Sequence, residues 1–395
     1  MSATMFERVS TAAYLDYAAS TPLDPAVIDA MQAALGDPLL TANASSTTHP
    51  AGRRAAVAVE SARASVAALV DAEPREVIFT SGATEADNLA IFGTARYRRG
   101  EGRHIISAMT EHKAVTDPLK QLARDGYDVE WLPVGRDGVI QPDQVAASLR
   151  DDTILVTLMA VNNELGVIND LAAIAALCRE RDIRCHVDAA QAPGKIPLSV
   201  SAIPADSFAL SAHKMYGPKG IGALVCRATF APQIEPLFYG GGQERGLRPG
   251  TPATHQVIGF GVAADRCLEL GVADESLALL NEQLVAGLLA VPGVELNAAA
   301  APRVPHIVSV NVADVHGDAL LLAMEPIAVS TGAACSTVSR EPSAVLRAIG
   351  LEPSRAESTL RFSVGRFSTP SDVAAAVAQF AAAVDYVRAI GSDPR

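Results

Sequence analysis

The sequence has 395 residues, 49% of them hydrophobic, which is enough to bury a large core and to form two domains. Its formal net charge of −12 argues against direct binding of a nucleic-acid backbone. The five cysteines include no CxxC pair. A structural zinc site and a disulfide framework are therefore not expected, and a reducing, cytoplasmic setting is the default.

The termini and apolar runs give no sign of targeting. The stretch 1–13 lacks a basic region followed by an apolar one, so no signal peptide is expected. No uncharged run is long enough to cross a bilayer, so no membrane partner is expected. The basic cluster Arg96–Arg99 is local, and we interpret it as a solvated helix end or a docking patch in preference to a nucleic-acid site.

Strand-like and helix-like segments alternate through the first two thirds of the chain. Asp24 and Pro25 open a predicted helix that runs to about Leu35, with Asp24 as its N-cap. Helices are also predicted at 53–70, 113–124 and 171–180, and apolar strands at 77–80, 104–107, 129–132, 154–159, 184–187, 208–210 and 223–226. Such continuous apolar strands between helices indicate a mainly parallel sheet covered on both faces.

The pattern changes after about Pro252. A long helical stretch continues past Cys267, and further elements follow that are typical of a smaller α+β domain. They are helices at 281–290, 343–349 and 371–388 and strands at 307–312 and 327–330. We therefore predict a large domain at 23–260 and a small domain formed by 1–22 together with 261–395.

Lys214 is the most informative single residue. It follows the apolar strand 208–210, with Ser211 and His213 close by, and could form a Schiff base with pyridoxal phosphate. Asp188 ends an earlier strand and could keep the pyridine nitrogen of that cofactor protonated, which makes the ring an electron sink. A solvated loop lysine and a helix-capping carboxylate are the ordinary alternatives.

Two further segments could hold a planar, phosphorylated cofactor. Thr80–Glu85 joins a strand to a helix that begins near Glu85, where Gly82 permits close backbone approach and the helix N-terminus attracts an anion. The same arrangement occurs without a ligand in many α/β proteins. His112, at the start of another helix, could stack on a ring and shuttle protons, or could be a structural histidine.

Polar segments later in the chain suit a ligand or a second subunit. Asn162–Glu164 follows a strand directly, at the edge where open parallel sheets bind ligands, although a plain turn is the alternative. The glycine-dense segment 240–251, which includes Thr251, is predicted to press against a ligand or a neighbouring subunit, or to be a flexible linker.

A cysteine and an arginine near the end of the chain complete the candidate site. Cys335 lies in a run of small residues, where a loop would let its thiolate react, whereas the other four cysteines lie in apolar elements and are expected to be inert. Arg361 is a candidate clamp for a carboxylate, because a guanidinium group binds a carboxylate through two hydrogen bonds.

These segments, in this order, resemble the cysteine desulfurases of the aminotransferase class V group, which are fold-type I pyridoxal-phosphate enzymes. The likeness runs from Tyr14 to Phe367. The matching segments are 80–88, 111–113, 162–164, 186–191, 211–222 and 240–251. The resemblance implies an α/β large domain with a mainly parallel sheet covered by helices, and a smaller α+β domain.

The resemblance also implies a role for each candidate residue. Lys214 would hold pyridoxal phosphate, Asp188 would pair with the pyridine nitrogen, Gln191 would contact the ring hydroxyl and His112 would stack on the ring. The phosphate would contact Ala83, Thr84, Ser211 and His213, and also Thr251 of the other subunit, which implies a homodimer.

The substrate carboxylate would bind Asn43, Arg361 and Asn163, the last of which also belongs to the cofactor site. No metal is expected. Ala42 and Ala44 flank Asn43 where the family commonly has Gly and Pro, which could loosen that turn.

The segment Ser330–Cys335 is similar to that of the NifS and IscS subgroup, whose cysteine loop is long. This implies that Cys335 takes sulfur from L-cysteine as a persulfide and releases L-alanine. An acceptor protein would then receive the sulfur for iron–sulfur cluster assembly, tRNA thiolation or DNA phosphorothioation. An aminotransferase or lyase on the same scaffold would leave Cys335 idle, and a non-catalytic assembly subunit is a further alternative.

Overall fold

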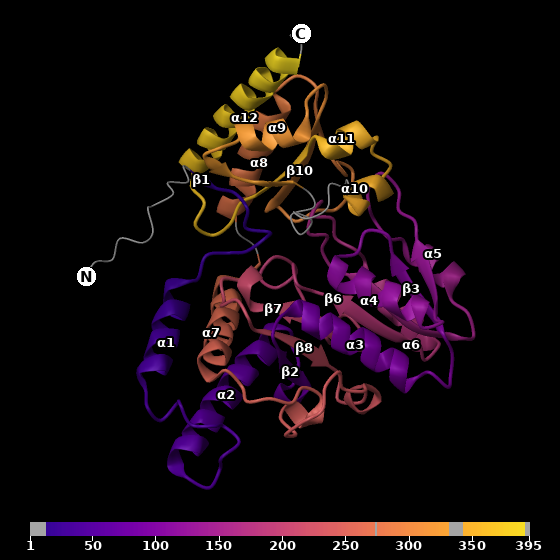
Figure 1. The fold of residues 1–395 in the computed structure, drawn as a ribbon, viewed down its shortest axis with the longest axis vertical. Helices are drawn as coiled ribbons and strands as arrows, with labels where there is room; N and C mark the ends of the chain where they lie inside the picture. The colour runs from indigo at the N-terminus through magenta and orange to yellow at the C-terminus, as the bar shows by residue number, and fades with distance from the viewer. Residues whose placement is uncertain (1–12, 273–274, 332–342, 392–395) are drawn as a thin grey trace.

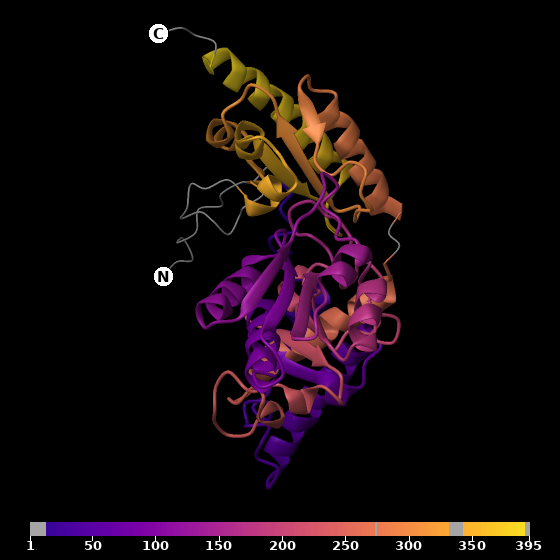
Figure 2. The same cartoon turned by 90° about the vertical axis from the view of Figure 1, so that its right-hand side faces the viewer.

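The computed structural model describes residues 13–272, 275–331 and 343–391. The chain forms two packed units: a large domain around a seven-stranded sheet, and a smaller domain that contains the C-terminal helix, at the top of Figure 1. Figure 2 shows the same two units, one above the other, from the side. The predicted α/β fold with a smaller α+β domain is confirmed.

One mainly parallel sheet organises the large domain. Its strands are β2 (Val77–Thr80), β3 (His104–Ala108), β4 (Asp128–Leu132), β5 (Thr153–Met159), β6 (Arg184–Asp188), β7 (Ser207–Ser211) and β8 (Gly222–Cys226), in the spatial order β2, β8, β7, β6, β5, β3, β4. The pairs from β4 to β7 are parallel, and β8 runs antiparallel to both β7 and β2. Every residue of β5 and β7 is buried, which explains why these strands are continuous apolar runs.

Helices cover both faces of this sheet, as the sequence predicts. On one face, α3 (Ala83–Tyr97) packs against β5 to β8 and against α4 (Lys113–Arg124). The other face carries α2 (Pro50–Leu69), α6 (Leu171–Glu180) and α7 (Thr254–Leu270), which share one core with the strands through side chains such as Val66, Ile174 and Phe260. The two remaining helices of this domain lie further out: α1 (Pro25–Gly36) packs against α7, and α5 (Pro142–Ser148) packs against α6.

Local sequence determines where several helices begin. The Asp24 carboxylate accepts the N–H of Ala26 at 3.0 Å, and Pro25 takes the first position of α1, as predicted. The helices α4 and α6 have the predicted bounds, whereas α3 already begins at Ala83, ahead of the predicted Glu85.

The smaller domain is built from antiparallel strands and helices. Its main sheet has the order β12 (Ser330–Thr331), β13 (Thr359–Ser363), β10 (Ile307–Val312) and β9 (Val294–Leu296). A separate parallel pair joins β1 (Ala13–Tyr14) to β11 (Ile327–Ala328). The helices are α8 (Glu275–Leu289), α9 (Gly317–Ala323), α10 (Ala344–Ala348), α11 (Pro353–Glu357) and α12 (Pro370–Gly391). The single strand predicted at 327–330 is thus two short strands, because each half pairs with a different partner.

The chain leaves the large domain at the end of α7. The boundary predicted at residue 260 falls inside this helix, yet Ala263, Ala264 and Cys267 pack in the core of the large domain together with Phe260. α7 also packs along α1 and α2. The transition therefore comes after Leu270, because a continuous helix stays with the core that its apolar stripe faces.

The C-terminal helix α12 is long and apolar enough to cross a membrane by length and composition. Its side chains Val373, Phe380 and Val384 are buried in the core of the small domain. The helix packs against α8, α9 and the β1–β11 pair. Its apolar face therefore serves the packing of this domain.

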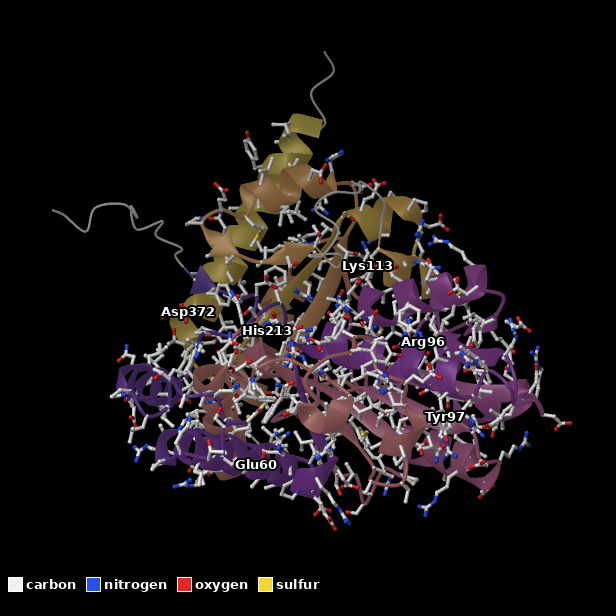
Figure 3. All side chains as sticks on the ribbon, turned by 60° about the horizontal axis from the view of Figure 1, so that its bottom comes forward. Glu60, Arg96, Tyr97, Lys113, His213 and Asp372 are labelled. Carbon is white, nitrogen blue, oxygen red and sulfur yellow. The ribbon has the colours of Figure 1, made fainter. Side chains whose placement is uncertain are left out.

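The basic cluster predicted to be a helix end or a docking patch lies at the end of α3. Figure 3 shows Arg96 and Tyr97 on the large domain, away from Lys113 and His213, which lie near the junction of the two domains. Arg98 is 8% exposed and pairs with Glu101 at 2.5 Å and Asp182 at 3.3 Å. Its charge is therefore neutralised locally, as at a capped helix end.

Candidate active site

Two predicted site residues stand at the carboxyl ends of neighbouring strands. Asp188 ends β6, and Lys214 follows β7 in the short 3-10 helix η2 (Ala212–Lys214). The two strands pair in parallel with Asp188 opposite Ala209, so both residues leave the sheet at the same edge. Ligands bind at that edge in open α/β sheets. The sheet thus brings together the lysine and the carboxylate singled out in the sequence.

The turn that carries Lys214 is clamped by the N-terminal segment. The N–H and the hydroxyl of Thr21 both donate to the His213 carbonyl, at 2.9 and 3.0 Å, and the hydroxyl accepts the N–H of Tyr216 at 2.7 Å. Tyr216 has a positive φ of 65° and is held further by Arg366, whose guanidinium lies 4.0 Å from the ring centroid. These contacts hold the backbone on both sides of Lys214.

Asp188 lies in a group of buried acids. It is 6% exposed, and its Oδ1 accepts the N–H of Ala190 at 2.9 Å. Burial raises the pKa of Asp87 and that of Glu111 well above the usual carboxyl range, and the nearby charge of Asp188 adds to both effects. The protonated forms of Asp87 and Glu111 are therefore favoured, which limits the negative charge that accumulates beneath Asp188.

A buried histidine ties Asp87 to the sheet. His186 contacts Asp87 Oδ1 through Nε2 at 3.1 Å and the Ser207 hydroxyl through Nδ1 at 2.8 Å. Burial lowers the pKa of His186 to about 3, so its ring is neutral at physiological pH. This residue therefore connects strands β6 and β7 to α3 behind the site.

The side chain of Gln191 is held from both ends of its amide. Its Nε2 donates to the Ala18 carbonyl at 2.7 Å, and its Oε1 accepts a hydrogen bond from Lys195 Nζ, also at 2.7 Å. Gln191 is 2% exposed. The amide is therefore oriented before any ligand arrives.

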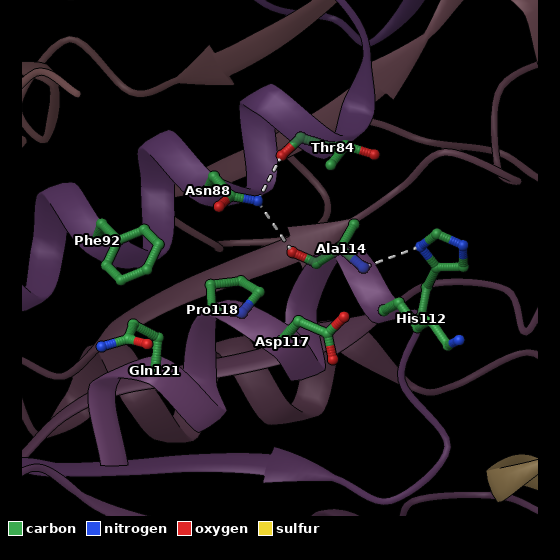
Figure 4. A pocket seen from close by; sticks show the side chains of 9 residues that line it. Thr84, Asn88, Phe92, His112, Ala114, Asp117, Pro118 and Gln121 are labelled. Carbon is green, nitrogen blue, oxygen red and sulfur yellow. Dashed lines mark hydrogen bonds between the residues drawn. The ribbon is translucent and has the colours of Figure 1, made fainter. Parts of the chain in front are cut away.

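His112 is the N-cap of α4 and borders a cavity between α3 and α4. Its Nδ1 accepts the N–H of Ala114 at 3.1 Å, drawn in Figure 4, which places the ring proton of the neutral form on Nε2. Burial and the charge of Lys214 lower the pKa of His112, with Asp188 opposing. The cavity, of about 490 Å³, is lined by Thr84 beside His112 and extends to Phe92 and Gln121.

The N-terminus of α3 offers backbone N–H groups next to this cavity. Its N-cap, Gly82, has no side chain that could occupy the first-turn amides, and a Cβ added there would meet only open space within 4 Å. Ala83 and Thr84 form the first turn. This end of the fifteen-residue helix can therefore accept an anion.

Arg361 belongs to the small domain, and its side chain reaches a residue of the large domain. It sits on the inner strand β13, is 2% exposed, and donates to the Asn163 carbonyl at 2.8 Å and to Asp16 Oδ1 at 2.7 Å. Its Nε is buried without a hydrogen-bond partner among the described residues. An unsatisfied buried donor of this kind suits an anionic ligand. The structure thus joins Arg361 and Asn163, two of the three predicted substrate residues.

The third, Asn43, lies elsewhere in the chain. It is exposed in the connection between α1 and α2, where its Oδ1 accepts the N–H of Ser45 at 2.9 Å. That connection is at the end of the molecule opposite the small domain (Figure 1). Within one chain, the structure does not bring Asn43 together with Arg361.

Ser343, the first described residue after Cys335, is anchored to the large domain. Cys335 itself lies outside the described residues. Ser343, which caps α10, donates its hydroxyl to Glu164 Oε2 at 2.5 Å. Burial raises the pKa of Glu164 to about 7, although the bond from Ser343 opposes this. The four other cysteines are buried, as predicted.

The glycine-dense segment 240–251 is fastened by a buried ion pair. Glu244 accepts from both terminal nitrogens of Arg63, at 2.7 and 2.8 Å, and also from the N–H of Phe79 at 2.8 Å. Arg248 pairs with Glu85 at 2.8 Å. Thr251 is the last residue of this anchored loop and is exposed. These contacts favour an ordered loop over a flexible linker.

Sequence reasoning missed several residues that shape this site, namely Asp16, Thr21, Arg63, Lys195 and Glu244. Each acts through a partner distant in the sequence, except Lys195, which follows Gln191 by four residues. That spacing was the one local signal that could have drawn attention to it.

The gathered groups match the parts of pyridoxal phosphate. A lysine amine, a buried carboxylate and an imidazole suit its aldehyde, its pyridine nitrogen and its ring face. The open N-terminus of α3 suits its phosphate. The Nε of Arg361, which has no hydrogen-bond partner among the described residues, is available to donate to an anionic ligand.

Comparison with protein families gives a match over nearly the whole chain. The model of the family described as aminotransferase class-V matches residues 13–376. The "Cysteine desulfurase IscS" of Vibrio atlanticus is 46% identical over 376 residues, covering 95% of this chain and 93% of that relative. The protein of the same name from Aeromonas hydrophila is 46% identical over 361 residues, covering 91% and 89%.

Solved structures agree with these relatives. A "NIFS-LIKE PROTEIN" superposes with a TM-score of 0.87 at 32% identity, covering 95% of this chain and 99% of its own. "SspA in complex with cysteine" has a TM-score of 0.81 at 35% identity, covering 90% and 100%. DndA from Streptomyces lividans has a TM-score of 0.75 at 40% identity, covering 89% and 99%.

Proposed function

The chain belongs to the aminotransferase class-V family and within it to the cysteine desulfurases, and we propose that it takes sulfur from free L-cysteine at the sheet edge where Lys214 and Asp188 meet. The observation that carries this proposal is that Lys214 and Asp188 leave the sheet at one edge and lie close enough to His112 for both charges to act on its pKa. The similarity to a protein solved with cysteine supports the same substrate.

The chain's own residues would hold pyridoxal phosphate as follows. Lys214 would bind it through its amine and Asp188 would contact its pyridine nitrogen, while Gln191 would contact its ring hydroxyl and His112 its ring face. Ala83, Thr84, Ser211 and His213 would surround its phosphate. When bound, the cofactor supplies an electron sink for the carbon that carries the substrate's amino group.

Substrate binding would place the amino acid between the two domains. Arg361 would bind the carboxylate through its guanidinium, with Asn163 alongside. Asp16 would orient that guanidinium from its other side. Lys214 would then move the α-proton, and His112 would take the thiol proton. Nδ1 of His112 accepts a hydrogen bond from the N–H of Ala114. The ring must break that hydrogen bond before Nδ1 can accept the thiol proton.

Sulfur transfer would use Cys335. Its thiolate attacks the substrate sulfur, so a sulfur–sulfur bond forms while the bond between that sulfur and the β-carbon breaks. The electron pair of the broken bond stays with carbon, which takes up a proton and leaves as L-alanine. The persulfide on Cys335 balances the reaction without an external oxidant.

Further steps would need partners. We propose that an acceptor protein takes the persulfide sulfur for iron–sulfur cluster assembly or for a tRNA or DNA thiolation pathway. The chain's net charge of −12 favours a protein over direct contact with nucleic acid. A homodimer would let the exposed Asn43 and Thr251 reach the site of the other subunit. We expect this reaction in the cytoplasm.

The test is a product assay with L-cysteine and a thiol reductant. Equal amounts of L-alanine and sulfide are expected, and Cys335→Ser should abolish both. Cys178→Ala removes a buried cysteine of α6 and serves as the matched control. It should retain the activity.

Other outcomes point to the alternatives. A yellow protein whose reaction ignores Cys335→Ser would be an aminotransferase or lyase on this scaffold. A protein that shows no visible cofactor band, with Lys214→Ala indistinguishable from the parent, would be a non-catalytic assembly subunit.

A further inference from the structure

Lys195 is a half-buried lysine that the mechanism above does not use. It follows β6 by a short turn, and its Nζ donates to Gln191 Oε1 at 2.7 Å. Burial lowers the pKa of Lys195 to about 7, and the charges of Lys214 and Arg361 lower it further, while Cys267 opposes them. Keeping the Lys195 amine protonated at this position costs free energy, because the ammonium group loses solvation there. The charged form therefore needs a compensating environment.

A cavity at the domain junction explains how the charge is tolerated. This cavity has a volume of about 460 Å³, and its wall includes Lys195, Lys214, His306 and Arg366. Neither ring nitrogen of the buried His306 has a hydrogen-bond partner in the described part of the chain. A space of this size, bordered by these polar groups, has room for water, which would solvate the remaining protons of Lys195.

The contact with Lys195 has a definite consequence for Gln191. A lysine ammonium only donates and a backbone carbonyl only accepts, so Oε1 must face Lys195 and Nε2 must face Ala18. Nε2 carries two protons, and Ala18 uses one of them. The second remains for a ligand at the sheet edge.

We propose that Lys195 is a positioning residue for the cofactor, which holds the Gln191 amide with its N–H toward the ring hydroxyl and, while it is protonated, adds a second positive charge beside Lys214. The inference rests on the proposed function, because it assumes that pyridoxal phosphate binds at Lys214. Both effects favour the unprotonated state of the nitrogen that Lys214 contributes to the bound cofactor. The charge repels an added proton, and the amide stabilises the deprotonated ring hydroxyl.

Three variants of the cofactor-loaded enzyme separate the two effects. Lys195→Met removes charge and donor, Lys195→Gln keeps a donor without charge, and Lys195→Arg keeps both. The first readout is the pH midpoint of the cofactor's visible absorption band. Lys195→Met should raise it by about one unit, the usual effect of one neighbouring charge. Lys195→Gln should give a smaller rise, and Lys195→Arg a shift of at most a few tenths.

The second readout is the dissociation constant of pyridoxal phosphate, measured by equilibrium dialysis. Lys195→Met should weaken binding about tenfold, the value of one charge-assisted hydrogen bond. A midpoint unchanged in Lys195→Met, or shifted equally in Lys195→Arg, would overturn the proposal.

A Gln191→Ala variant distinguishes this outcome from failure of the proposed function. If Gln191→Ala shifts the band and Lys195→Met does not, the cofactor site stands and the role of Lys195 falls. If the parent protein shows no cofactor band, or Gln191→Ala leaves the band unchanged, the proposed cofactor site itself is wrong.

Discussion

Arg361 and Asp16 form an ion pair of 2.7 Å between positions 345 residues apart in the chain. Asp16 follows β1, and Arg361 occupies the inner strand β13 of the small domain. Burial raises the pKa of Asp16, while Arg361 opposes that effect. The pair therefore sets the direction of the guanidinium that we assign to the substrate carboxylate.

Asp16→Ala should raise KM for L-cysteine about tenfold with a smaller effect on kcat, because a misdirected clamp loses substrate binding first. Asp16→Asn, which keeps an acceptor oxygen, should give an intermediate value. Steady-state kinetics measure both. Asp29→Asn changes an exposed acid of α1 and should leave KM unaltered. An unchanged KM in Asp16→Ala would show that Arg361 needs no support from Asp16.

The buried pair between Arg63 and Glu244 should stabilise the fold and the loop at 240–251. The side chains are 8% and 5% exposed, so removing Glu244 leaves the guanidinium without its main partner. Glu244→Ala should lower the free energy of unfolding by about 3 kcal/mol. Urea unfolding measures the change. Glu60→Ala is the matched control, since Glu60 contacts the same arginine at 3.1 Å but is 62% exposed, and it should cost less than about 1 kcal/mol.

Glu164 should make stability depend on pH around neutrality. Burial raises its folded pKa to about 7, above the value of an unfolded glutamate. A group with a raised folded pKa contributes stability at low pH, and that stability is lost as pH rises from about 4.5 to about 7. Glu164→Gln keeps an acceptor for Ser343 and cannot titrate. Between pH 5 and pH 8 it should therefore lose about 2 to 3 kcal/mol less stability than the parent, since part of the parent's loss already occurs below pH 5.

Urea unfolding across that pH range measures this difference. Lys113 and Arg361 also act on Glu164, and both remain in the variant. Glu352→Gln, an exposed acid ahead of α11, should leave the pH dependence as it is. Parallel curves for the parent and Glu164→Gln would contradict the raised pKa.

Subunit complementation should show whether Thr251 serves the site of the other subunit. In a mixed dimer of Lys214→Ala and Thr251→Ala chains, one site carries both defects and the other carries neither if Thr251 acts across the interface. Mixed dimers should then recover about half the parent activity, well above either variant alone. If Thr251 acts within its own chain, every site is defective and mixing restores nothing. Differently tagged, co-expressed chains permit the measurement.

The secondary structure and the edge of the sheet were predictable from local patterns. β2, β10, α4 and α6 have the predicted bounds. Their apolar runs and caps lie within the segments themselves, so short-range propensity and burial determine them. The placement of Lys214 and Asp188 at one edge of the sheet was predictable as well, because residues that end adjacent parallel strands emerge at the same edge.

Other elements depended on partners that no local window contains. The predicted strand 327–330 divides because β11 pairs with β1 and β12 pairs with β13. The transition between the domains comes after Leu270 and not at the predicted residue 260, because α7 continues to pack on α1 and α2. In both cases the pairing partner, and not the intrinsic preference of the segment, determined the result.

The sequence by itself thus determined the alternation of strands and helices, the candidate site residues Lys214 and Asp188 and the strand ends that bear them. Only the tertiary structure decided which distant side chains support them: Asp16 beside Arg361 and Glu244 beside Arg63. It also placed the connection between α1 and α2, which carries Asn43, at the end of the molecule opposite the small domain. The physical reason is that hydrophobic periodicity and capping act over a few neighbouring residues, whereas buried charges find their partners only when distant segments pack together.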